Sequence, residues 1–152
     1  MAASLSCAVI GEATAMHRGG VQATVGALRA HGATALPVPT AIRSASGRLL
    51  QPLPASFIEA QLSDLAEHRP LDVALIGSLA TLGMVETVAS LLEMHWLDTV
   101  VLDLNAFPRD QYGRIPADVL EAVGLFLAPQ VSLAIMDDDV AERLTGVPIC
   151  EP

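Results

Sequence analysis

The chain has 152 residues, a length that fits one domain able to bury a core without disulfides or metals. It carries 17 acidic residues against eight basic ones, all of them arginine, and has a formal net charge of -9. This acidic balance argues against nonspecific nucleic-acid binding, and the lack of lysine excludes a P-loop lysine and a Schiff-base lysine.

The composition is 52% hydrophobic but only 3% aromatic, so the core must be built mainly from Ala, Val, Leu and Ile. No segment approaches the ~20 consecutive apolar residues that span a bilayer, and the first residues lack the basic start of a signal peptide. We therefore expect a cytoplasmic protein without a membrane partner. Its extra apolar surface is expected to lie in a subunit interface, most simply that of a homodimer.

Short apolar runs alternate along the chain with stretches of helical period. Strands are expected over residues 5–10, 33–38, 73–76, 99–104 and 131–136, and helices over residues 21–30, 57–67, 79–92, 117–127 and 140–145. Residues 39–54 have no firm period and are expected to form a long, partly extended connection. The alternation predicts the α/β class: one domain over residues 1–152, with a mostly parallel sheet of about five strands in three αβα layers.

The clearest strand–turn–helix unit spans residues 71–93. A run that is apolar on both faces, Val73-Ala74-Leu75-Ile76, stops at Gly77, and a helical pattern follows. Ligands of open α/β sheets bind where strands end and helices begin. The corner formed by Gly77 and Ser78 is therefore the first place to expect a ligand.

Two other strand-end positions admit more than one interpretation. Arg18, Gly19 and Gly20 precede a helix and could hold an anion, although a flexible entry turn explains them as well. Asp103 closes a buried strand beside Asn105. It is either a ligand-facing or magnesium-linked carboxylate or a residue that caps the turn through its own side chain.

The remaining polar residues do not predict a metal site. Asp137, Asp138 and Asp139 precede a helix, so capping is favoured over a metal cluster. The four histidines have no partner at metal-ligand spacing. Cys7 and Cys150 cannot form a disulfide framework or a cysteine cluster.

Five segments, taken together, resemble one enzyme family. They are Gly19-Gly20-Val21-Gln22-Ala23, Pro39-Thr40-Ala41-Ile42, DVALIGSL at residues 72–79, Val100-Val101-Leu102-Asp103, and Glu142-Arg143-Leu144-Thr145-Gly146. In order and spacing they resemble the hydroxymethylpyrimidine/phosphomethylpyrimidine kinases of thiamine synthesis. That family lies in the ribokinase-like superfamily, together with the pyridoxal kinases. The resemblance covers only the family's N-terminal part, which implies a truncated ribokinase-like fold.

The sequence also departs from the pattern of this family at several positions. The later G-T-G-x-x-D segment, which supplies the family's anion hole and catalytic base, has no counterpart here. The substrate-facing aspartate of the family's N-terminal loop falls at Ala13, the pyrimidine-binding glutamine at Ala45, and the methionine of I-G-M-L at Ser78. The glutamate associated with magnesium and nucleotide falls at Val140. Each replacement removes a specific contact, and Asp103 is the main charged position retained.

The resemblance with these departures implies a degenerate, kinase-like domain that binds a small pyrimidine or pyridine ligand or a protein partner. It would need no cofactor and would not transfer phosphate. The alternative is an active hydroxymethylpyrimidine, phosphomethylpyrimidine or pyridoxal-type kinase that uses ATP and magnesium and is completed by another subunit. Topology and resemblance together nominate these ligand-binding candidates: Gly11, Arg18, Gly19, Gly20, Ser78, Asp103 and Asp137.

Overall fold

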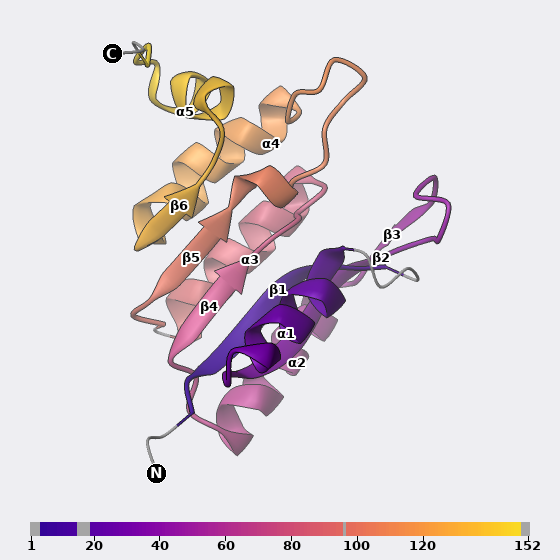
Figure 1. Cartoon of the computed structure of the whole chain (residues 1–152), viewed down its shortest axis with the longest axis vertical. Coiled ribbons are helices and arrows are strands. Elements are labelled where there is room, and N and C mark those ends of the chain that lie inside the picture. Colours follow the sequence, from indigo (N-terminus) through magenta and orange to yellow (C-terminus); the bar gives the residue numbers. More distant parts are fainter. Residues whose placement is uncertain (1–3, 15–18, 96, 150–152) are drawn as a thin grey trace.

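The computed structural model describes residues 4–14, 19–95 and 97–149. A six-stranded sheet in the order β3-β2-β1-β4-β5-β6 forms its centre (Figure 1). Neighbouring strands run parallel except β2 and β3, so the predicted α/β class with a mostly parallel sheet is confirmed. The strands are β1 (Ser6–Thr14), β2 (Thr34–Arg43), β3 (Leu50–Pro52), β4 (Val73–Ile76), β5 (Val100–Asp103) and β6 (Leu133–Ile135).

The helices divide between the two faces of the sheet. In Figure 1, α1 lies in front of β1, whereas α3 and α4 lie behind the strands. The helices are α1 (Gly20–Ala30), α2 (Ala55–His68), α3 (Leu82–His95), α4 (Ala117–Ala122), which continues as a π-helical turn (Val123–Leu127), and α5 (Asp138–Thr145). In the part of the chain that the structure describes, every helix is too short or too polar to cross a membrane.

Two hydrophobic clusters follow from this division. The alternation of β4 sends Ala74 and Ile76 into the larger cluster, with buried residues of α2, α3 and α4. Val73 and Leu75 pack on the smaller cluster, which Cys7 and Val9 form with Val21 and Val25 of α1. Because successive strand residues face opposite sides, one continuous apolar run serves both layers.

The sheet has one strand more than the five expected. β3 lies inside residues 39–54, which were expected to be a long, partly extended connection, and it pairs antiparallel with the end of β2. The turn between them is closed by the Ser44 N–H, which donates to the Leu49 carbonyl oxygen at 2.9 Å. A strand of three residues is too short to show a period, which is why the sequence pattern missed it.

β1 is also longer than expected. The prediction ended it at Gly11, because glycine in an apolar run often marks a turn. Instead the strand continues to Thr14 beside β2, with a shift of register between Gly11 and Glu12. This irregularity carries the acidic side chain of Glu12 to the carboxyl end of the sheet, where the candidate site lies.

Candidate ligand-binding site

The parallel strands β1, β2, β4 and β5 bring their carboxyl ends to one edge of the sheet, beside the start of α1. A pocket of about 400 Å³ lies there. Its lining is mostly apolar or small, with a few polar groups: Val9, Ile10, Gly11, Glu12, Thr14, Gly19, Gly20, Val21, Ala23, Thr24, Arg43, Leu75, Gly77, Ser78, Asp103 and Ala106. Five of the seven nominated residues are therefore brought together, namely Gly11, Gly19, Gly20, Ser78 and Asp103.

Two glycines allow the backbone segments of this pocket to approach each other. A Cβ added to Gly11 would lie 3.3 Å from the Ser78 nitrogen, where the ends of β1 and β4 meet. Gly20 begins α1 at φ 63, and a Cβ there would overlap the Glu12 carbonyl oxygen. Glycine at both positions lets α1 and the corner after β4 close on the end of β1.

The main charged feature of the pocket is an ion pair that the sequence analysis did not single out. Glu12, only 4% exposed, accepts two hydrogen bonds from Arg43, from Nε at 2.6 Å and from Nη2 at 2.8 Å. Arg43 also donates from Nη1 to the Gly47 carbonyl oxygen at 3.1 Å. These hydrogen bonds from the guanidinium to Glu12 raise the pKa of Arg43 above its ordinary value.

Asp103 has the capping role, one of the two that the sequence left open, and its role toward a ligand stays a prediction. Its Oδ1 accepts a hydrogen bond from the Asn105 N–H at 3.0 Å and so caps the short 3₁₀ helix Leu104–Ala106. The same side chain lines the pocket. Ser78 lines it as well and is 9% exposed. Beside the Glu12–Arg43 pair, the lining residues therefore include one further carboxylate, Asp103, and three hydroxyl-bearing residues, Ser78, Thr14 and Thr24.

The other two nominated residues are not part of this group. Arg18 lies outside the described residues. Asp137 is not among the pocket-lining residues and instead caps α5, accepting from the Val140 N–H at 2.9 Å. It also pairs with Arg109 at 2.8 Å. The hydrogen bond from Val140 and the pair with Arg109 lower the pKa of Asp137, and the capping interpretation is confirmed.

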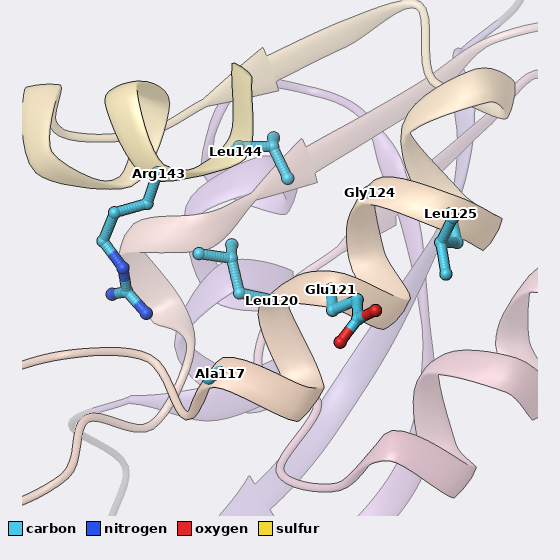
Figure 2. Close-up of a pocket in the computed structure, with 7 residues that line it drawn as sticks. All are labelled: Ala117, Leu120, Glu121, Gly124, Leu125, Arg143 and Leu144. Atoms are coloured by element: carbon cyan, nitrogen blue, oxygen red, sulfur yellow. The ribbon is translucent and has the colours of Figure 1, made fainter. Parts of the chain in front are cut away.

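A second hollow, of about 560 Å³, lies between α4 and α5 (Figure 2). Its lining is chiefly apolar, from Leu120, Leu125 and Leu144. The guanidinium of Arg143 donates from Nη2 to the Ile115 carbonyl oxygen at 2.9 Å, and Glu121 is exposed on α4. The polar groups do not converge on a common point, so this hollow lacks the features of a ligand site.

The described residues offer few groups suited to metal binding or nucleophilic attack. They contain no group of three or more His, Cys, Asp or Glu side chains placed to hold a metal ion. In the pocket, both oxygens of Glu12 are engaged by Arg43, which leaves Asp103 as the only other carboxylate among its lining residues. Cys7 is buried in β1, and burial raises the pKa of its thiol, so it is a core residue rather than a nucleophile. The carboxylates of the pocket by themselves therefore do not form a binding site for magnesium and a nucleotide.

Comparison with known proteins places the chain in a family. The model of the phosphomethylpyrimidine kinase family matches residues 18–151, and the chain belongs to this family. It is 29% identical over 132 residues to the hydroxymethylpyrimidine/phosphomethylpyrimidine kinase of Salmonella typhimurium. That match covers 85% of this chain and 50% of the relative, so the chain spans about half the length of this curated relative.

Solved structures share the fold. The phosphomethylpyrimidine kinase of Clostridium difficile superimposes with a TM-score of 0.87 at 20% identity, over 97% of this chain and 65% of that one. The pyridoxal kinase of Bacillus subtilis, solved as an ADP complex, gives a TM-score of 0.83 at 18% identity, over 99% of this chain and 58% of that one. The similarity to a ribokinase-like kinase fold expected from the sequence is thus confirmed.

Proposed function

We propose that this chain binds a small pyrimidine or pyridine ring in the pocket at the carboxyl ends of β1, β4 and β5 and does not transfer phosphate. The observation that carries the proposal is the pocket itself. About 400 Å³ is enough for a substituted six-membered ring, and it lies at the strand-end position that ligands of open α/β sheets use. The apolar walls suit the faces of a ring, and Ser78 and Asp103 suit its polar substituents.

The charges of the pocket support binding without phosphoryl transfer. Glu12 and Arg43 neutralise each other, so Asp103 leaves the lining residues with a net negative charge. Phosphoryl transfer depends on cationic groups that stabilise the charge of the transferring phosphate, and the chain contains no lysine. Ala13 stands where the family pattern places its substrate-facing aspartate, which removes a further polar contact.

A pair of variants on α1 tests this proposal. Thr24 lines the pocket, whereas Ala27, on the same helix, is exposed. Titration calorimetry with hydroxymethylpyrimidine and with pyridoxal should show binding of at least one of them to the wild-type chain. Thr24→Phe, which fills the pocket, should weaken that binding by at least about tenfold, and Ala27→Phe should leave it unchanged. No binding of either ring, or equal affinity in both variants, would overturn the proposal.

A second candidate function is favoured by the position of Asp103. This carboxylate lies at the strand-end corner of the pocket, as a residue that acts on a substrate hydroxyl would. The chain would then be one part of a hydroxymethylpyrimidine, phosphomethylpyrimidine or pyridoxal-type kinase, completed by another polypeptide that supplies the site for magnesium and nucleotide. It predicts ATP-dependent consumption of the ring substrate that Asp103→Asn abolishes. The absence of turnover, for the chain alone and with candidate partners, would exclude it.

A further inference from the structure

Whether the pocket at the carboxyl ends of the strands can attract an anion depends on the Glu12–Arg43 pair. Among the described residues, Arg43 is the only basic side chain that lines this pocket. Glu12 neutralises it, accepting hydrogen bonds from Nε at 2.6 Å and from Nη2 at 2.8 Å. Nη1 donates in addition to the Gly47 carbonyl oxygen. An anion that approached the guanidinium would therefore also approach the Glu12 carboxylate, which repels it.

The location of this pair indicates a role besides stability. Glu12 is almost fully buried, and Arg43 is partly buried. A buried ion pair gives little net stabilisation over an apolar pair of similar size. Both residues line the pocket, where low exposure to solvent strengthens the effect of their charges on a bound group. The pair is thus placed to affect which ligands bind.

Asp103 and the start of α1 also act on the pocket, with charges of opposite sign. Asp103 contributes the full negative charge of a carboxylate. Helix α1 begins at Gly20, a lining residue, and its first turn holds no acidic residue, so its N-terminus contributes about half a positive charge. Because Glu12 and Arg43 neutralise each other, the sum of these charges is negative.

We infer that Glu12 makes the pocket select uncharged or cationic rings and disfavour anionic ones, above all the phosphate ester of a ring that it binds. Its carboxylate neutralises Arg43 and repels a phosphate from that guanidinium, which is specificity through an unfavourable contact. Ser78 and Thr24 then offer hydroxyls to uncharged substituents, such as the hydroxymethyl group of a ring. This inference rests on the proposed function, because it requires that a ring enters the pocket.

Titration calorimetry with hydroxymethylpyrimidine and with pyridoxal, each compared with its own phosphate, tests the inference. The quantity measured is the ratio of two dissociation constants, that of the phosphate over that of the free ring compound. A change in pocket shape that weakens both ligands alike cancels in this ratio. The wild-type chain should bind the phosphate at least about tenfold more weakly than the free ring compound, a result that needs no variant.

Three variants, checked for folding by circular dichroism, show whether the freed charge of Arg43 is responsible. Glu12→Gln keeps the size of the side chain and an oxygen that accepts from Arg43, but it leaves the guanidinium charge unneutralised, so the ratio should fall by at least about tenfold. Glu12→Gln/Arg43→Gln removes the freed cation, and the ratio should return to the wild-type value. Glu59→Gln makes the same change of side chain and of net charge on the exposed surface of α2 and should leave the ratio unchanged.

The outcomes separate this inference from the proposed function. A wild-type ratio of one or less, a Glu12→Gln ratio equal to that of the wild type, or a double variant that keeps the low ratio of Glu12→Gln would overturn the inference while ring binding stands. An equal fall in Glu59→Gln would also overturn it, because net charge rather than the pair would then be the cause. If neither ring nor phosphate binds, the proposed function fails and this inference fails with it.

Discussion

At the scale of single residues, the Glu12–Arg43 ion pair is the interaction whose loss should most affect the stability of the fold and the charge of the pocket. The two residues lie on neighbouring strands, and Glu12 is almost fully buried while Arg43 is 26% exposed. A buried pair of this kind gives little net stabilisation over an apolar pair. Losing one partner is costly, because the other charge stays buried without compensation.

Arg43→Met should therefore lower the free energy of unfolding by about 3 kcal/mol, because it leaves the Glu12 carboxylate buried and unpaired. Glu12→Met/Arg43→Met removes both charges and should recover more than half of that loss. Urea unfolding of the three proteins measures both values. Equal losses in the single and double variants would show that the pair is not coupled in this way.

A second prediction concerns Gly20, and Gly113, which has a similar backbone conformation, serves as its control. Gly20 and Gly113 both have positive φ, 63 and 75, but only at Gly20 would an added Cβ meet another residue, the Glu12 carbonyl. Gly113→Ala should cost about 1–2 kcal/mol from the backbone alone, and Gly20→Ala should cost clearly more. Chemical denaturation compares them, and a Gly20→Ala loss no larger than that of Gly113→Ala would contradict the packing described here.

The role of a single residue could be predicted from the sequence where its partner lies only a few positions away along the chain. The capping role of Asp137 was predictable, because a cap is formed with an N–H three residues along the chain. The Glu12–Arg43 pair joins residues 31 positions apart across a register shift, so no local pattern reveals it. The one available signal was an acidic residue directly after an apolar run, Ile10-Gly11-Glu12.

At the scale of elements, the attachment of α5 depends on its first turn. Asp137 caps the helix and pairs with Arg109, and both interactions favour its ionised form. Since the pKa of Asp137 is lower in the folded chain, its stabilisation is present above the unfolded value of about 3.9 and is lost as the pH falls through the folded value.

Asp137→Ala should thus lower stability by about 1 kcal/mol at neutral pH, and the difference from wild type should shrink as the pH drops below about 4. The neighbouring variant Asp138→Ala is the control, because Asp138 lies in the same first turn without serving as the cap, and it should cost less. Thermal unfolding across acidic pH measures both, and a difference that grows in acid would contradict this sign.

The order of the elements was predictable because apolar runs and helical periods alternate plainly along the chain. β4 was predicted with its observed bounds, and the expected helix at 117–127 is present as α4 and its π-helical turn. β3 and the extension of β1 were not predictable, because tertiary pairing with β2 produces both. Pairing partners far along the chain leave no period in the sequence.

At the scale of the whole molecule, the chain combines a kinase-family fold with a pocket at the carboxyl ends of its parallel strands. The family match and the likeness to solved kinases concern the scaffold, and the proposed binding role concerns the pocket at its carboxyl edge. The cytoplasmic location expected from the sequence remains a prediction.

The most direct test of the central claim is thermal unfolding of the purified chain with single ligands and with pairs of ligands. The ligands are hydroxymethylpyrimidine, its phosphate, pyridoxal and magnesium–ATP. A ligand present at a hundredfold excess over its dissociation constant stabilises the folded state by about 2.7 kcal/mol, which gives a clear rise in midpoint. Our account predicts such a rise with a pyrimidine or pyridine compound and none with magnesium–ATP. A rise with magnesium–ATP, or no rise with any ring compound, would contradict it.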